Sequence, residues 1–230
     1  MEELTSSLQL VRIDETPCDV LLVSGFDKTG EAVEAHREVL SKSSWYFKMI
    51  FDEANFGTED DEPMVFYVPD VSTDCIKSIV AFTYTENFEE THGNVLELLA
   101  GAAFLQMPLL IASCKECIVA CLSSDNWILL WRFSNNHFTD LAESVKRYVR
   151  DNFDELVYEK QLYDLEFDEL VELVSYDPLV GCEKKTCSDA FYRWIGHKLD
   201  QRLSYALLQM NKIPANVALP MEDAIYRLTR

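Results

Sequence analysis

The chain has 230 residues, of which 48% are hydrophobic and 26% charged, so its composition is that of an ordinary globular protein and excludes a predominantly disordered chain. Its 40 acidic residues outnumber its 20 basic ones and give a formal net charge of −20. Such a surface repels phosphate backbones and anionic lipid head groups, so we expect no binding to nucleic acids or membranes and expect proteins as partners.

Residues 1–16 are predicted to hold a short amphipathic helix, because three aliphatic residues in them have helical spacing: Leu4, Leu8 and Val11. The apolar run 19–23 is typical of a strand that is buried on both faces. The alternating residues 31–35 follow a turn that is bracketed by Gly25 and Gly30, and they predict the return strand of a hairpin.

The rest of the first half predicts helices and one further strand. Residues 36–51 have helical spacing, with a break where Ser44 can cap a second helix. Residues 65–68 predict a third strand. Three later helices have recognisable start signals, which are Ser72 or Thr73, the pair Asn94 and Glu97, and Pro108. Early strands followed by helices indicate an α+β fold.

From residue 123 onward the pattern is helical throughout. Apolar residues recur about every 3.6 positions in the segments 125–134, 140–153, 156–163, 168–175, 186–199 and 203–211. Short polar breaks separate these segments, as they do between packed antiparallel helices. The second half is therefore predicted to be an all-α unit.

The residues that could carry chemistry do not form a recognisable catalytic or metal site. The four histidines have no metal spacing and no nucleophile motif beside them, and no glycine-rich phosphate loop is present. Cys114, Cys117 and Cys121 would share one face of a helix with apolar neighbours and lack a fourth ligand, so we expect buried thiols rather than a zinc site. No enzymatic activity and no cofactor are expected.

The cysteines also bear on the compartment. The chain shows no secretory signal and no apolar run of about 18 residues, so we expect reduced thiols in a protein of the cytoplasm, with the nucleus as a second location.

Several motifs of the first half resemble a BTB/POZ domain, in the order in which that family has them. They are Cys18-Asp19-Val20, Ala35-His36-Arg37, the run from Ser44 to Phe51, the run from Val65 to Val71, and the run from Leu98 to Met107. The resemblance covers residues 17–122. Residues 123–230 are similar to the BACK domain that follows BTB in kelch-like proteins. The motifs of that second resemblance are Ser124-Asp125-Asn126, Phe133-Ser134, Phe153 to Leu156 and Ala190 to His197.

The resemblance implies an adaptor. BTB domains of this group dimerise through the N-terminal helix in residues 1–16 and the helix after the first hairpin, which makes Leu4, Leu8, Val11 and Trp45 candidate dimer residues. BTB–BACK proteins bring substrates to a cullin-3 ubiquitin ligase. The implied partners are therefore cullin-3, a second copy or another BTB protein, and an unidentified protein substrate.

The family contacts cullin through a hydrophobic residue, any residue, and then Glu, in the loop before the third strand. Here Phe56 matches the hydrophobic position, but Thr58 stands where the family has Glu, and Glu59 follows one position later. Phe104 is a further candidate for the cullin contact. Phe56 could instead be tucked beneath its own loop, and that alternative stays open.

Three polar residues near the hairpin have a structural interpretation. In repressors of the family, the positions of Asp19 and Arg37 lie near a charged pocket of the dimer. This chain has a longer hairpin and no zinc fingers in its second half, so we expect Asp19 to orient the neighbouring turn. His36 is expected to be a core histidine whose hydrogen bonds are satisfied.

Two functions remain open at this point. The chain resembles a cullin-3 adaptor, but no repeat of about 50 residues follows the helical unit, so no propeller is expected in it. The alternative is an oligomeric scaffold, or a dominant-negative partner, that pairs with other BTB proteins without binding cullin. The Thr58 departure favours the scaffold, whereas the BACK-like helices favour the adaptor.

Overall fold

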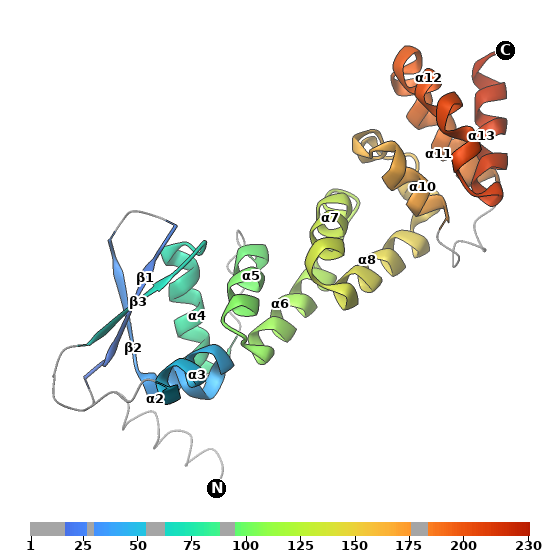
Figure 1. Ribbon diagram of the computed structural model, residues 1–230. Coiled ribbons are helices and arrows are strands. Elements are labelled where there is room, and N and C mark those ends of the chain that lie inside the picture. The colour runs from blue at the N-terminus through green and yellow to red at the C-terminus, as the bar shows by residue number, and fades with distance from the viewer. Residues whose placement is uncertain (1–16, 27–29, 54–62, 88–94, 176–183) are drawn as a thin grey trace, which may run out of the picture. The chain divides into compact units, whose positions relative to one another are not determined.

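The computed structural model divides the chain into two compact units, residues 1–120 and 121–230 (Figure 1). The residues whose structure is described are 17–26, 30–53, 63–87, 95–175 and 184–230. Strands occur in the first unit, and the described residues of the second unit form helices. The α+β prediction is therefore confirmed.

The first unit contains a three-stranded sheet with the order β2-β1-β3. The central strand β1 (Val20–Ser24) pairs antiparallel with β2 (Ala32–Ala35), which confirms the predicted hairpin. On its other side β1 pairs parallel with β3 (Met64–Val68), so that Val20 lies opposite Met64. A parallel neighbour needs a crossover connection, and the helices between β2 and β3 supply part of it.

The sheet is fully buried on one face only, so the prediction that β1 is buried on both faces was wrong. Val20 and Leu22 have no exposed surface, whereas Leu21 and Val23 are half-buried. Helix α4 (Thr73–Thr85) contacts β1 and β2 and lies beside the sheet (Figure 1). On β3 the alternate residues Val65 and Tyr67 are exposed. An apolar run alone does not tell whether one face or both faces of a strand are covered.

The other helices of the first unit that the structure describes are α2 (Arg37–Ser43), α3 (Trp45–Glu53), α5 (Val95–Phe104) and α6 (Pro108–Ala120). The predicted break between α2 and α3 is present, because the Ser44 hydroxyl accepts a hydrogen bond of 3.1 Å from the Phe47 N–H. The Ser72 hydroxyl caps α4 in the same way, and Pro108 opens α6 as expected.

Helix α5 is tied to the start of α4 through a carboxylate. Glu97 was expected to pair with Asn94, which lies outside the described residues. The Glu97 carboxylate accepts a hydrogen bond of 2.6 Å from the backbone N–H of Ser72, the cap residue of α4. Next to this contact, Gly101 of α5 lies so close to α4 that an added Cβ would come within 3.2 Å of Ile79. A small residue there lets the two helices approach closely.

The second unit contains the helices α7 (Trp127–His137), α8 (Thr139–Asp151), α9 (Phe153–Leu156), α10 (Phe167–Ser175), α11 (Lys184–His197), α12 (Leu199–Gln209) and α13 (Ala215–Leu228), with 3-10 turns η1 (Lys160–Asp164) and η3 (Met210–Lys212). The predicted helix 156–163 was wrong, since α9 ends at Leu156 and a 3-10 turn follows. The prediction also missed α13, in which Val217, Met221 and Ala224 form a buried stripe around an internal Pro220.

Two contacts fix the helices of the second unit to one another. The Trp194 indole on α11 donates a hydrogen bond of 2.8 Å to the carbonyl of Leu165, which precedes α10. Arg132 on α7 donates from Nε and Nη2 to the two carboxylate oxygens of Glu169 on α10, both at 2.7 Å. This fork geometry orders the pair more than a single contact would.

The cysteine prediction was only partly right. Cys114 is fully buried, but Cys117 is half-buried and Cys121 is exposed just after α6 ends. Burial raises the pKa of the Cys114 thiol to about 12, which keeps it protonated. Among the residues that the structure describes, no group of His, Cys, Asp and Glu side chains could hold a metal ion. No described helix is long and apolar enough to cross a membrane.

Candidate protein-interaction surface

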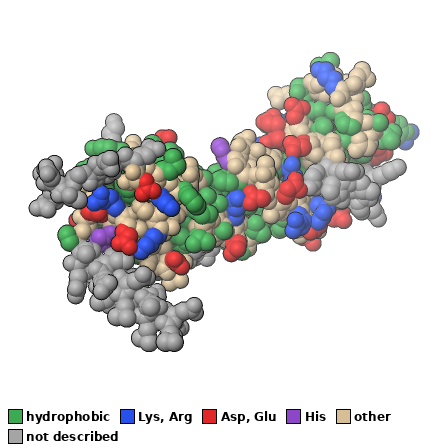
Figure 2. Space-filling model, turned by 60° about the horizontal axis from the view of Figure 1, so that its bottom comes forward, with side chains coloured by type: hydrophobic (Ala, Val, Ile, Leu, Met, Phe, Trp, Pro, Cys, Tyr) green, Lys and Arg blue, Asp and Glu red, His purple; other side chains and the backbone are tan. Residues whose placement is uncertain are grey.

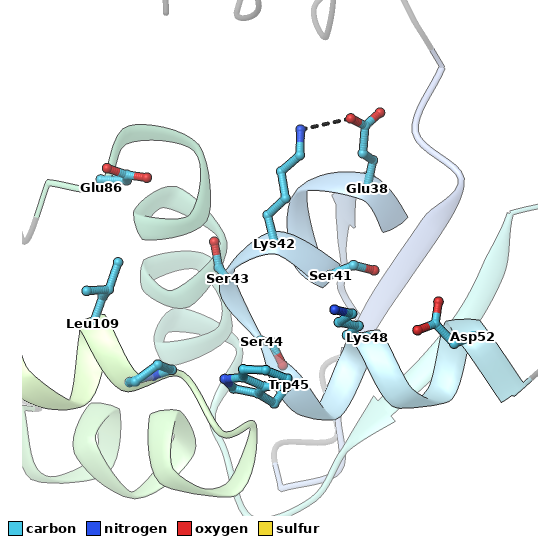
Figure 3. Close-up of a pocket in the computed structure, with 11 residues that line it drawn as sticks. Glu38, Ser41, Lys42, Ser43, Ser44, Trp45, Lys48, Asp52, Glu86 and Leu109 are labelled. Carbon is cyan, nitrogen blue, oxygen red and sulfur yellow. Dashed lines mark hydrogen bonds and ion pairs between the residues drawn. The ribbon is translucent and has the colours of Figure 1, made fainter.

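An open hollow of about 470 Å³ lies on the first unit (Figure 3). It is lined by residues of α2 and α3, by Glu86 at the end of α4, and by Pro108 and Leu109 at the start of α6. At its rim, Lys42 and Glu38 form an exposed ion pair of 2.8 Å along one side of α2. The hollow lies where several helices meet, which is a common place for a binding surface.

The start of α3 is held in place by the corner between α5 and α6. The Ser44 hydroxyl donates a hydrogen bond of 2.5 Å to the carbonyl of Leu105. The backbone N–H of Trp45 donates to the carbonyl of Gln106 at 3.2 Å. Gln106 adopts a positive φ of 52°, which turns the chain at this corner. These bonds position the first residues of α3 beside the start of α6.

Three large apolar side chains of this region reach solvent, of which Trp45 and Leu109 line the hollow and Met49 does not. Trp45, Met49 and Leu109 are 60%, 56% and 62% exposed. Trp45 and Met49 are four residues apart on α3 and so share one helix face. Lys48 lies beside them, with its Nζ 5.4 Å from the centre of the Trp45 ring. Exposed aromatic and aliphatic residues that a rigid backbone holds in place are typical anchors of protein interfaces.

Phe104, predicted as a cullin contact, lies at the end of α5 and is 41% exposed. Its ring packs 5.2 Å from that of Tyr46, which in turn lies 6.0 Å from the ring of Phe66 on β3. One side of Phe104 is thus fixed by the aromatic core, and the other side can contact a partner. On the face shown in Figure 2, other hydrophobic side chains also reach the surface among charged ones.

The remaining predicted contacts lie outside the described residues. They are the candidate dimer residues Leu4, Leu8 and Val11 and the candidate cullin residues Phe56, Thr58 and Glu59. Among the predicted contact residues, Trp45 alone lines the hollow. Leu109, which lines it too, was not predicted from the sequence. Met49 could have been found from its position four residues after Trp45, but the exposure of Leu109 depends on how α6 is placed.

Asp19 and Arg37 form a pair that caps a helix. The Asp19 carboxylate accepts a hydrogen bond of 2.8 Å from the backbone N–H of Arg37, the first residue of α2, and one of 2.7 Å from the Arg37 side chain. Partial burial acts to raise the pKa of Asp19, but the hydrogen bonds from Arg37 outweigh it and hold this pKa below its usual value. The carboxylate thus orients the junction between β2 and α2.

His36 lies at the edge of the core rather than inside it, because it is only half-buried. Its backbone N–H donates to the Tyr84 hydroxyl at 3.0 Å, and its Nδ1 lies 2.6 Å from the same hydroxyl oxygen. Its Nε2 lies 3.8 Å from the Cys18 sulfur. These contacts connect the N-terminal end of α2 to α4.

The contact between Asp19 and Arg37 predicts how the stability of the first unit depends on pH. The pKa of Asp19 is lower in the folded protein than in the unfolded chain. Asp19 therefore stabilises the fold at a pH above its pKa in the unfolded chain, and this stabilisation is lost as the pH falls through its pKa in the folded protein. We expect Asp19→Asn to be less stable than the parent at neutral pH and the difference to shrink below about pH 4. Urea unfolding at a series of pH values measures it, and a difference that does not depend on pH would contradict the assignment.

The comparisons with known proteins cover both units. Residues 8–122 match the family model of the BTB/POZ domain, and residues 128–220 match that of the BTB And C-terminal Kelch (BACK) domain. The chain belongs to the BTB–BACK family of kelch-like proteins. As a family, BTB–BACK kelch-like proteins are adaptors typically linked to cullin-3 ubiquitin ligases rather than enzymes.

Individual relatives are distant in sequence. Kelch-like protein 13 of Mus musculus is 28% identical over 218 residues, which are 94% of this chain and 32% of that protein. Kelch-like protein 3 of Homo sapiens is 26% identical over 217 residues, which are 94% of this chain and 35% of that protein. The chain thus spans about a third of the length of these relatives. Among solved structures, the BTB domain of zebrafish PATZ1 matches with a TM-score of 0.41 and 24% identity, over 51% of this chain and 93% of that one.

Proposed function

We propose that this BTB–BACK chain is a dimeric adaptor that recruits protein substrates to a cullin-3 ubiquitin ligase. The observation that carries the proposal is the order of the two domains, since the BTB match is followed directly by the BACK match along most of the chain. A protein that only dimerised would not need the second unit. We place this activity in the cytoplasm or the nucleus, where thiols such as Cys114 stay reduced.

The adaptor works through surfaces rather than through chemistry. In this proposal, Trp45 and Met49 belong to the face that pairs with a second BTB domain, and Phe104 belongs to the face that meets cullin. A few buried anchors supply most of the affinity of such interfaces. Two copies in one particle then present two cullin sites, which raises the effective concentration of ligase at a bound substrate.

The dimer face can be tested at Trp45. We expect Trp45→Asp to weaken self-association by at least tenfold, because a carboxylate would be desolvated where an aromatic anchor was buried. Sedimentation equilibrium measures the dissociation constant. The exposed Tyr67, which lies on β3 and is 68% exposed, offers a matched control as Tyr67→Asp. An unchanged constant for Trp45→Asp would place the dimer contact elsewhere.

The cullin contact is tested at Phe56 and Thr58. We expect Phe56→Ala to abolish capture of the N-terminal domain of cullin-3 in a pull-down without affecting dimerisation. Phe26, an aromatic residue that is 68% exposed in the same unit, serves as the control variant Phe26→Ala. Capture that Phe56→Ala leaves unchanged would remove Phe56 as the anchor.

Thr58, which stands where the family has Glu, allows a second test of the cullin contact. A missing charged hydrogen-bond partner costs about 1–3 kcal/mol at a buried contact. We therefore expect Thr58→Glu, which restores the family residue, to tighten binding of the cullin domain by about tenfold or more. Calorimetric titration measures the change. Equal affinity would show that Glu59 or another residue already fills the position.

The Thr58 departure also favours a second candidate function. If the chain has lost cullin binding, a BTB dimer would remain that pairs with related proteins and titrates them. In that case the parent chain and Phe56→Ala would both capture the cullin domain only at background level, whereas pairing with another BTB protein would persist.

A further inference from the structure

A groove of about 310 Å³ in the second unit lies between the start of α10 and the helix α12. Its apolar walls are the rings of Phe167, Trp194 and Tyr205. The rings of Phe167 and Tyr205 meet edge to face, with their centres 5.4 Å apart. Trp194 and Phe167 are buried, so their positions are fixed by the core. The groove therefore has a rigid aromatic lining.

The guanidinium of Arg202, which also lines the groove, is engaged with the protein itself. Its Nη1 donates to the carbonyl of Trp194 at 2.9 Å, and its Nη2 donates to the carbonyl of Tyr163 at 2.7 Å. Its Cζ lies 4.1 Å from the centre of the Trp194 ring. Arg202 thus acts as part of the wall and has two of its donors occupied.

Carboxylates dominate the charge around the groove. Glu166 and Asp168 line it and are exposed, and neither is in a salt bridge with a described residue. Glu166 and Asp164 lie near enough to both Arg202 and Arg132 for their negative charges to favour the charged guanidinium groups. The neighbouring Glu169 is different, because both of its oxygens bind Arg132. The lining of the groove thus holds two exposed carboxylates and one guanidinium, that of Arg202, which is already engaged, so the groove favours a cation.

An apolar shelf continues from the groove along α12. Tyr205 is 43% exposed, and Leu208, three residues later on the same helix face, is 75% exposed. Leu208 is a more exposed side chain than any other large hydrophobic residue in the described part of the chain. Tyr205 and Leu208 thus extend the aromatic lining of the groove into an exposed apolar patch, which is the kind of surface that a partner covers.

We propose that this groove docks a basic side chain, arginine or lysine, from a protein segment that also carries an aliphatic residue. The cation would lie against the exposed ring of Tyr205 and pair with Glu166 and Asp168, and the aliphatic residue would cover Leu208. Charge complementarity selects this occupant, since an acidic segment would meet like charges at the mouth. The inference concerns the partner of the second unit and does not depend on cullin binding.

The test uses a peptide of defined chemistry. Acetyl-Leu-Ala-Arg-Ala-Leu-amide is titrated into the isotope-labelled full chain, and the amide NMR signals of Asp168 and Tyr205 are followed. The same peptide with Glu in place of Arg is the ligand control. We expect the Arg peptide to shift these signals and to bind at least tenfold tighter than the Glu peptide. Added salt is expected to weaken the binding of the Arg peptide.

Variants test the assigned contacts. The double variant Glu166→Gln, Asp168→Asn is expected to lower the affinity for the Arg peptide about tenfold, since the two proposed ion pairs with the peptide are lost. Glu222→Gln on α13 removes an exposed carboxylate that does not line the groove, so the affinity for the Arg peptide should not change. Leu208→Ala changes neither the charge of the protein nor its core, and it should also lower the affinity for the peptide. It keeps the proposal testable if the double variant does not fold.

Three results would overturn the proposal. The first is equal binding of the Arg and Glu peptides, and the second is binding that neither Leu208→Ala nor a folded double variant changes. The third is loss of self-association in Leu208→Asp by light scattering, because a second copy of the chain would then occupy the surface.

Discussion

Phe47→Ala is expected to lower the free energy of unfolding of the first unit by about 3–5 kcal/mol. The Phe47 side chain has no exposed surface. Its ring stacks 5.6 Å from that of Phe51 and meets that of Phe66 on β3 at 5.4 Å. The substitution would leave a cavity between α3 and the sheet, where the surrounding side chains can relax only in part.

Phe47 also matters for function, because it lies in the same helical turn as Trp45. A helix that shifts toward the cavity would move the exposed face of α3, so we expect weaker self-association together with the loss of stability. Urea unfolding with a probe in the first unit measures the effect. Phe26→Ala in the same unit is the control, since Phe26 is exposed and should change stability by less than about 0.5 kcal/mol. A loss below about 1 kcal/mol in Phe47→Ala would contradict the packing described.

Trp194→Ala is expected to destabilise the second unit by a similar amount, about 3–5 kcal/mol. Trp194 is 3% exposed, and its ring centre lies 5.9 Å from that of Phe167. The substitution removes three contacts at once, namely the ring packing, the hydrogen bond to the Leu165 carbonyl, and the surface on which the Arg202 guanidinium lies. The Leu165 carbonyl would be left without its partner.

Trp194→Phe separates these contributions. It keeps an aromatic ring but loses the indole N–H, so we expect a smaller loss of about 1–3 kcal/mol. Leu219→Ala on α13 is the exposed control, because Leu219 is 61% exposed. Thermal and urea unfolding measure all three variants. Equal stability of Trp194→Ala and Leu219→Ala would show that α11 is not fixed through Trp194.

Local signals in the sequence predicted much of the fold. The hairpin and the break at Ser44 follow from turn residues and a cap, which act over a few positions. Helix α13 was missed because Pro220 lies inside it, although Val217 and Met221 keep a helical spacing. The coverage of β1 could not be predicted, because it depends on where α4 packs.

The candidate surfaces were harder to predict, since they join distant parts of the chain. The resemblance pointed to Trp45, but Leu109 lies beside it only because the corner at Gln106 places α6 next to α3. The groove of the second unit combines Glu166 with Tyr205 from a helix that follows much later. Periodicity describes one helix at a time and cannot show which side chains from different helices meet.

Light scattering on the purified chain, alone and mixed with the N-terminal domain of cullin-3, tests the central proposal most directly. One chain has a mass of 26.5 kDa, so the proposed adaptor is expected as a dimer of about twice that mass, which binds two cullin domains. A particle of 26.5 kDa at micromolar concentration that ignores the cullin domain would contradict both dimerisation and ligase recruitment.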